Sequence, residues 1–400
     1  MRAVGTALGV GSVLEGSVRR EGDRLRISAQ LVDTREGFHL WSKAFDRRLN
    51  DVFAIQQEIA EAVVEAVRGE VGEGPAPRVP APRRPADFRA YELYLRGIGL
   101  ASRRGDVAAM REATALLEEA TRIDPRYAPA HAGLAEAYYA LWDFVPLFGR
   151  VTEPSLDRAL ESARRAAQLD PGLADAHAVL GWILSFRHDW PSAVASLERA
   201  TELDPASARA HRWLATVLLI RGDGQRALFE YQLALRLDPV SSVVNSTYGR
   251  ALLTTGQLDE GIARLRYAVL LNPSNELARF LLAWAYHVQG RDRAAAEVLL
   301  ALSPRPVRPL LRATTRLFGL DFLVRALHTL SAWHWGDSCL VRGYGGASML
   351  AFLGDREGAL RCLEETHGPG IGFSKVDPWF DPYRDDPRFQ ALLARVGLAD

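Results

Sequence analysis

The sequence predicts a mainly helical protein, a superhelix of repeated helix pairs, preceded by a small segment that combines strands with one helix. Two observations predict this fold class. An Asp-Pro or Asn-Pro step returns at a fixed distance through the middle of the chain, and residues 24–34 alternate between polar and apolar side chains. A long fixed period is the signature of stacked helical repeats, whereas a period of two indicates a half-buried strand.

The first 68 residues combine strand and helix signals. Residues 12–20 and 24–34 flank a Glu-Gly-Asp turn, which predicts a hairpin, and residues 38–46 follow the next turn as a third strand. Along 52–67 the apolar residues fall on one helical face. We therefore expect a partial α/β domain over residues 1–68.

A proline-rich linker follows over residues 69–87. Five prolines lie in this stretch: Pro75, Pro77, Pro80, Pro82 and Pro85. Such a density of proline favours an extended, semi-rigid chain. The helical part of the protein then covers residues 88–400.

The repeat is clearest in the positions of proline and of small residues. Beginning at Pro171, the step returns every 34 residues, at Pro205, Pro239 and Pro273. The interval from Pro125 to Pro171 is longer, which predicts an insertion between Trp142 and Pro154. Alanine or glycine keeps the same register, which lets two antiparallel helices approach closely, and proline ends the second helix. These small residues are Ala193, Ala200, Ala227, Ala234, Gly261 and Ala268.

This pattern resembles the tetratricopeptide repeat family. Close matches cover 174–207, 208–241 and 242–275, and looser ones cover 90–124, 128–173, 276–303 and 340–366. The resemblance implies a tetratricopeptide α-solenoid over residues 88–400. It also implies a concave face, lined by the first helix of each pair, that binds a protein or peptide.

The amino-terminal segment has a second resemblance. Gly11-Ser-Val-Leu-Glu-Gly-Ser-Val-Arg-Arg20, Ile27-Ser-Ala-Gln-Leu-Val-Asp33 and His39-Leu-Trp41 look like the TolB-like domain of bacterial signalling proteins. The tail from Asp377 to Phe389 is similar to the closing segment of the same arrays. That domain usually opens with a further strand and helix, but only about ten residues precede Gly11 here. In the family the upstream part joins a nucleotide cyclase, a Ser/Thr kinase or a winged-helix domain.

Resemblance to peptide-binding arrays gives eleven candidate groove residues. Aromatic and arginine side chains among them are the types that anchor interfaces, and Arg212 and Arg250 suit a peptide that carries a carboxylate. The alternative is that Trp182 and Trp284 only fill gaps between repeats. The candidates are Glu136, Tyr139, Trp182, Ser185, Phe186, Arg212, Thr216, Leu219, Arg250, Trp284 and His287.

Several short patterns superficially suggest catalysis or metal binding, but the sequence around each of them does not support that interpretation. The glycines of Gly9-x-Gly11-x4-Gly16 precede a strand instead of following one, so a phosphate loop is not expected. His131, His177 and His211 share one register position and are expected to pack between repeats. The acidic group Asp377, Asp381, Asp385 and Asp386 lacks calcium-loop spacing, and turns with helix caps explain it. We expect no catalytic residue, cofactor or metal.

Composition bears on the classes of partner and on the location that we expect for the protein. Basic and acidic residues balance at 49 each, which gives no reason to expect a nucleic-acid partner. No run of 18 apolar residues exists, so we expect no membrane contact and a cytoplasmic location. Cys339 and Cys362 are expected to serve as small apolar residues.

The sequence therefore leaves two functions to compare. The first is a non-catalytic scaffold or adaptor that binds a protein or peptide in the concave groove. The alternative is a sensory or regulatory carboxy-terminal portion of a larger signalling protein, a nucleotide cyclase, Ser/Thr kinase or winged-helix regulator, whose output domain lies outside these 400 residues. The short stretch before the Leu-Glu-Gly-Ser strand motivates this alternative.

Overall fold

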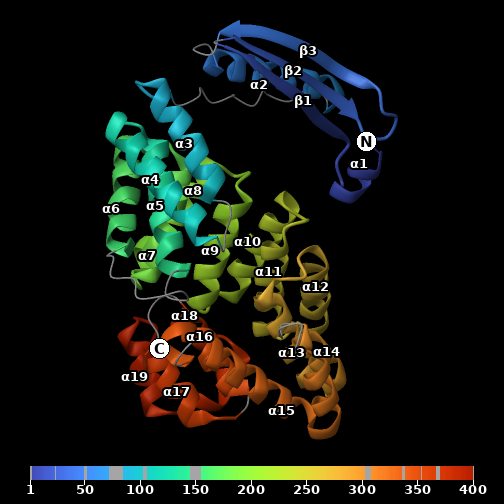
Figure 1. The fold of residues 1–400 in the computed structure, drawn as a ribbon, viewed down its shortest axis with the longest axis vertical. Helices are drawn as coiled ribbons and strands as arrows, with labels where there is room; N and C mark the ends of the chain where they lie inside the picture. The colour runs from blue at the N-terminus through green and yellow to red at the C-terminus, as the bar shows by residue number, and fades with distance from the viewer. Residues whose placement is uncertain are drawn as a thin grey trace. The chain divides into compact units, whose positions relative to one another are not determined.

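The protein is described by a computed structural model that divides into two units, Met1–Glu92 and Leu93–Asp400 (Figure 1). Each unit is considered by itself. The structure describes residues 2–22, 24–48, 52–71, 84–101, 106–144, 155–301, 308–335, 338–352, 354–365 and 370–399.

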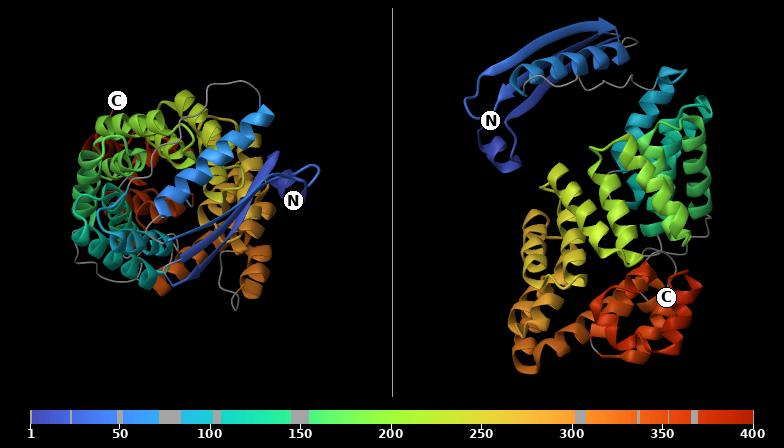
Figure 2. Two further views of the ribbon diagram at one scale, coloured as in Figure 1. Left: turned by 90° about the horizontal axis from the view of Figure 1, so that it is seen from above. Right: turned by 180° about the vertical axis from the view of Figure 1, so that it is seen from behind.

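The first unit is built on an antiparallel meander, which confirms the predicted strands. Its sheet has the order β1-β2-β3, and helix α2 packs against β2 and β3 (Figure 2). A short helix that the sequence did not predict, α1, precedes the sheet. The elements are α1 (Arg2–Leu8), β1 (Ser12–Glu21), β2 (Arg24–Asp33), β3 (His39–Arg48) and α2 (Val52–Val71).

The core of the first unit follows from the alternation along β2. Leu25, Ala29 and Leu31 point to the same face and are buried, together with Phe45 of β3 and Ile55 of α2. Successive strand residues face opposite sides of a sheet, so this face closes against α2. The predicted linker begins inside α2, and its residues 72–83 lie outside the described part of the chain. The boundaries 1–68, 69–87 and 88–400 therefore stay a prediction.

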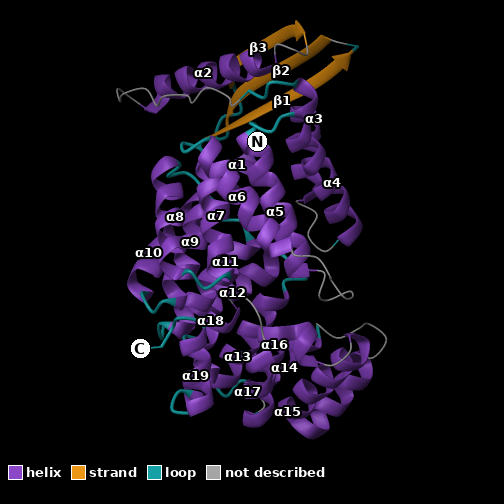
Figure 3. Cartoon of the chain, turned by 90° about the vertical axis from the view of Figure 1, so that its left-hand side faces the viewer, coloured by secondary structure: helices purple, strands orange, loops and turns teal. Residues whose placement is uncertain are grey.

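The repeat helices run from α3, which begins in the first unit, to α14, and from α5 onward they form successive antiparallel pairs, which confirms the predicted helical superhelix (Figure 3). Among them the regular pairs combine a first helix of 13 residues with a second of 14. They are α3 (Phe88–Ala101), α4 (Val107–Ile123), α5 (Ala128–Phe144), α6 (Ser155–Leu169), α7 (Ala174–Phe186), α8 (Trp190–Leu203), α9 (Ala208–Ile220), α10 (Gly224–Leu237), α11 (Ser242–Thr254), α12 (Leu258–Leu271), α13 (Glu276–Val288) and α14 (Asp292–Leu300). Helix α5 is longer, at 17 residues, and the predicted insertion after it includes residues 145–154, which lie outside the described residues.

Small residues bring the paired helices together, as predicted. A Cβ atom at Gly181 would lie 2.7 Å from Leu197 Cγ and 2.8 Å from the Ala193 carbonyl oxygen. A Cβ atom at Gly249 would lie 2.7 Å from Leu265 Cγ. Larger side chains at these positions would force the helices apart.

One register position joins every first helix from α5 to α13 to the turn before it. A side-chain nitrogen at this position bonds to the carbonyl oxygen of the proline six residues earlier, at 2.7–3.1 Å. A carbonyl oxygen only accepts, so each histidine here carries a proton on Nε2. The sequence predicted packing between repeats but missed this bond. The pairs are His131–Pro125, His177–Pro171, His211–Pro205, Asn245–Pro239 and Arg279–Pro273.

The chain ends in a closing region, defined as α16 to α19, whose buried residues continue the core of the repeats. Phe380 and Phe389 are fully buried and stack with ring centroids 6.1 Å apart. Cys362 is buried and disulfide-bonded, so the expectation that it serves only as a small apolar residue was wrong. The elements after α14 are α15 (Arg308–Trp335), α16 (Ser338–Phe352), α17 (Arg356–Glu365), α18 (Gly370–Ser374), the 3-10 helix η3 (Pro378–Tyr383) and α19 (Pro387–Arg395).

Helix α15, which leads from the repeats to the closing region, is broken at Gly319. The backbone there has φ 83° and ψ −175°, a conformation that is essentially restricted to glycine. Of the helices that the structure describes, none has the length and apolar character needed to cross a membrane.

Candidate functional site

The predicted groove residues all lie on first helices of the array, from α5 to α13, and fall into two groups. The α5–α9 cluster contains the candidates from Glu136 to Leu219. The α11–α13 cluster contains Arg250, Trp284 and His287. The two groups differ in what surrounds them.

Stacked aromatic rings form the centre of the α5–α9 cluster. The rings of Trp182 and Trp213 are parallel within 5°, with centroids 5.3 Å apart. Phe186 and Tyr139 contact the Trp182 ring edge-on at 5.3 and 6.4 Å. Tyr139, Phe186 and Trp213 are buried, whereas Trp182 is half-buried and presents part of its ring at the surface.

Arginines surround this aromatic stack. The guanidinium group of Arg209 binds the carboxylates of Glu136 at 2.8 Å and Asp175 at 2.6 Å, and lies 5.1 Å from the Trp213 ring centroid. Burial alone would lower the pKa of Arg209, but the two carboxylates outweigh it and raise that pKa. Arg212 is half-buried over the same ring at 5.7 Å.

Sequence reasoning missed Arg209, Asp175 and Trp213. A signal for Arg209 existed, because it lies three residues before Arg212 and so shares its helical face. The sequence also indicates the pairing of Arg209 with Asp175, because Asp175 lies 34 positions earlier and therefore occupies the same register position in the preceding repeat.

Besides Tyr139 and Phe186, three further candidates of the α5–α9 cluster are buried inside the array. The Thr216 hydroxyl bonds with the Tyr231 hydroxyl at 2.8 Å and donates to the Arg212 carbonyl oxygen. Ser185 donates to the Trp182 carbonyl oxygen at 2.6 Å, and Leu219 is 2% exposed. The bond between Thr216 and Tyr231 joins α9 to α10, whereas the bonds to the Trp182 and Arg212 carbonyl oxygens lie within α7 and α9.

The α11–α13 cluster is covered by the closing region of the same chain. The Arg250 guanidinium lies 3.9 Å from the Phe373 ring centroid, and its Nη2 atom lies 3.6 Å from Oδ2 of Asp377. The Trp379 ring contacts Trp284 at 5.4 Å and Phe280 at 5.7 Å. Figure 1 shows the orange and red closing helices lying against the repeats.

His287 is covered in the same way. Its ring lies 5.0 Å from the ring of Phe352 at the end of α16, and its Nδ1 atom bonds to Asp292 at 2.6 Å. Every predicted residue of the α11–α13 cluster thus contacts a side chain of the closing region.

Asp377 lies at the N-cap position of η3, as predicted, but its side chain makes no capping bond and serves instead as the buried counterion of Arg250. Its side chain is fully buried, and the Tyr344 hydroxyl donates to Oδ2. Burial raises the pKa of Asp377, while the positive charge of Arg250 opposes that rise. Asp386, in contrast, caps α19 as predicted.

Two further contacts attach the closing region to the ends of α8 and α9. Trp190 Nε1 donates to the carbonyl oxygen of Val396 at 2.7 Å. Gly372 of α18 lies so close that a Cβ atom there would be 2.5 Å from Ile220 Cγ2. A larger residue at Gly372 would push α18 away from the repeats.

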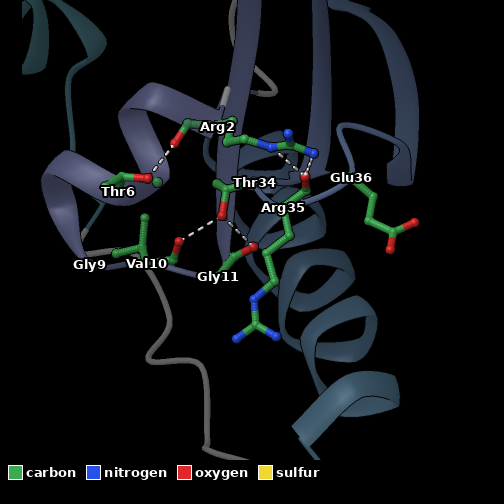
Figure 4. A pocket seen from close by; sticks show the side chains of 9 residues that line it. Arg2, Thr6, Gly9, Val10, Gly11, Thr34, Arg35 and Glu36 are labelled. Atoms are coloured by element: carbon green, nitrogen blue, oxygen red, sulfur yellow. Dashed lines mark hydrogen bonds between the residues drawn. The ribbon is translucent and has the colours of Figure 1, made fainter.

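A separate pocket of about 690 Å³ lies in the first unit, beside the glycines that superficially suggest a phosphate loop (Figure 4). The side chains of Arg2 and Thr34 in its lining are used within the protein. Arg2 donates to the Arg35 carbonyl oxygen at 2.7 Å, and Thr34 donates to the Val10 carbonyl oxygen at 2.7 Å. The glycines come before a strand, so the pocket lacks the strand-to-helix order of a phosphate site. Within the described residues, no group of three or more metal-binding side chains occurs.

Comparison with known proteins identifies the repeats. Residues 179–242 and 248–309 match the family model of the tetratricopeptide repeat. The helical array therefore contains tetratricopeptide repeats, as the sequence resemblance implied.

One curated relative is the putative adenylate cyclase 3 of Rhizobium meliloti (strain 1021). It is 37% identical over 186 residues, which are 46% of this chain and 31% of the relative. The chain thus spans less than a third of the length of that relative.

Solved structures share the fold at low identity. Human IFIT1, as a dimer with m7Gppp-AAAA, is 18% identical with a TM-score of 0.52, and the match covers 86% of this chain and 79% of that one. A thermophilic tetratricopeptide protein of Thermus thermophilus is 20% identical with a TM-score of 0.41, over 48% of this chain and 99% of that one. The likeness to IFIT1 shows the fold alone.

Proposed function

We propose that this chain is a non-catalytic interaction scaffold that holds a protein or peptide partner on the α5–α9 cluster. The observation that carries the proposal is the stack of Trp182 on Trp213 with Arg209 and Arg212 beside it. Tryptophan and arginine are the residue types that dominate interface energies. A guanidinium over an aromatic ring also suits a carboxylate on an extended peptide.

Partner capture tests this function. The immobilised chain is compared with its Trp182→Ala and Arg212→Ala variants in host extract, and each captured protein is then purified and titrated. We expect at least about tenfold weaker binding by both variants, with helicity by circular dichroism unchanged. Phe229→Ala, at an exposed position on α10, is the matched control. Equal affinity of the wild-type chain and its three variants would contradict the assignment of the binding site to the α5–α9 cluster.

A second function rests on a different observation. The curated relative bears the name of an adenylate cyclase, and this chain spans 31% of it. Together with the TolB-like motifs from Gly11 onward, this supports a regulatory portion of a larger signalling protein. A nucleotide cyclase is the output domain that the relative favours over a kinase or winged-helix domain.

The mass of the native polypeptide separates the two functions. An antibody raised against residues 174–275 would detect it in the host. A band well above 44.1 kDa, the mass of these residues, is the result expected for the larger signalling protein. A band at 44.1 kDa would favour a separate adaptor, for which we also propose a cytoplasmic location and the boundaries 1–68, 69–87 and 88–400.

A further inference from the structure

We propose that the α11–α13 cluster is a recognition site for a peptide that carries an aspartate followed two residues later by a tryptophan. In this chain the closing region occupies the site with Asp377 and Trp379. A partner segment of the same chemistry would displace it. This inference rests on the proposed function only in that the array binds peptides.

The contacts have the form of linear peptide recognition. Phe373, Asp377 and Trp379 lie within seven residues of one another, and each meets a side chain of α11 or α13. On the receptor side, Arg250 and Trp284 lie 34 positions apart, so they occupy the same register position in successive repeats. Successive repeats therefore supply the carboxylate site and the aromatic site in order along the inner face.

Charge explains why the site requires an acidic residue. Arg250 is 6% exposed, and a buried guanidinium group needs a carboxylate to offset its lost hydration. Among the described residues, Asp377 supplies that carboxylate. A ligand with a neutral side chain at this position would leave Arg250 buried without a counterion.

The internal pairing is incomplete, so another carboxylate can compete with it. The Nη2–Oδ2 distance of 3.6 Å is longer than a normal hydrogen bond. Arg250 Nε and Asp377 Oδ1 also have no hydrogen-bond partner among the described residues. A bidentate carboxylate from a partner would satisfy both the guanidinium edge and its own second oxygen.

Displacement by a peptide requires the closing region to separate from the repeats as a unit. Phe380 and Phe389 stack on each other within the closing region, although their apolar surroundings are continuous with the core of the repeats. Helix α15, which connects it to α14, is broken at Gly319, where the backbone already departs from helical geometry. Displacement therefore exposes part of a shared core, while the contact between Phe380 and Phe389 lies within the closing region and can persist.

The test uses a fluorescent peptide with the sequence of residues 371–386 and the full chain. In the wild-type chain the site is occupied, so we expect weak binding. Combining Asp377→Asn with Trp379→Ala removes the internal occupant's two anchors, and peptide affinity should rise at least about tenfold. Adding Arg250→Ala to that variant should abolish the gain. A control peptide with the position of Asp377 changed to asparagine should bind weakly to all of them.

A measurement on the wild-type chain covers the case in which the variants fold poorly. Excess peptide should accelerate amide hydrogen exchange where the closing region meets the array, in α18, and leave α10 unchanged. The proposal would be overturned if hydrogen exchange in α18 stayed the same at saturating peptide. It would also be overturned if the Arg250→Ala substitution left the affinity for the peptide unchanged. A wild-type dimer that dissociates on the Arg250→Ala substitution would also overturn the proposal, because the occupant of the site would then be a second copy of this chain. None of these outcomes alters capture at Trp182 and Arg212, so the two proposals fail separately.

Discussion

The α5–α9 and α11–α13 clusters are built on the same register positions of the same repeat, yet their surroundings differ. Trp182 and Trp284 are both half-buried tryptophans that contact a second tryptophan ring. For Trp182 that ring belongs to the next repeat, and for Trp284 it belongs to the closing region. Register position thus decides where on a first helix these side chains lie, whereas contacts distant in sequence decide what covers them.

The largest expected effect is on the covered cluster. Trp379→Ala removes a buried ring from between Phe280 and Trp284 and should destabilise the protein by about 3–5 kcal/mol. Urea unfolding followed by circular dichroism measures this loss. The exposed Phe229→Ala should change stability by less than about 0.5 kcal/mol. Similar losses for both variants would show that the closing region is not docked on α13.

The second prediction concerns the buried ion pair. Arg250→Met leaves the Asp377 carboxylate buried without its cation and should cost about 3 kcal/mol. Adding Asp377→Asn removes the orphaned charge, so the double variant should be more stable than Arg250→Met alone. Additive losses in this double-mutant cycle would mean that the two groups do not interact.

A smaller effect is expected at the α5–α9 cluster. Trp182→Ala removes a stacked but half-buried ring, and aromatic stacking contributes about 0.5–1.5 kcal/mol beyond area burial. We expect a loss of about 1–3 kcal/mol, below that of Trp379→Ala. Docking of the closing region should persist, which hydrogen exchange in α18 would report. Faster exchange there would show that the two clusters are coupled.

The smallest expected effect distinguishes two histidines in one register position. Glu230 holds Nδ1 of His211 at 2.6 Å, and this hydrogen bond raises the pKa of His211, whereas burial lowers the pKa of His131. The stabilising contribution of His211 is therefore complete below pH 6.5 and fades as pH rises through its folded-state pKa. The stabilising contribution of His131 is complete above pH 6.5 and fades as pH falls through its folded-state pKa.

Nuclear magnetic resonance titration of both rings checks this prediction. Glu230→Gln should lower the pKa of His211 and leave that of His131 unchanged. Identical titration curves for the two histidines in the wild-type chain would contradict it.

Local rules made the repeats predictable. The Asp-Pro steps end helices, and small residues such as Gly181 permit close packing, so both signals act within one helix pair. Alternation along 24–34 predicted the sheet for the same reason. Helix α1 was not predicted, since Gly5 and Gly9 interrupt its short apolar pattern.

The site was only partly predictable. Residue type and register placed Trp182 and Arg250 on first helices of the array, but burial of Arg250 depends on Asp377, far along the chain. The bond from Trp190 to Val396 spans 206 positions. No periodicity relates such partners, because the closing region follows α15, where the repeat pattern is lost. Asp377 was therefore taken for a turn residue.

The bonds from the fourth residue of each first helix to the preceding proline have a consequence for synthesis. Each closes a loop of six residues, as from His177 to Pro171, so its entropic cost is small and it can form as soon as one helix pair exists. The contacts that cover Arg250 require residues near the end of the chain. A polypeptide made from its amino end therefore has α11 in place before the residues that cover Arg250 are synthesised, so a partner present at the ribosome would reach Arg250 before Asp377 exists.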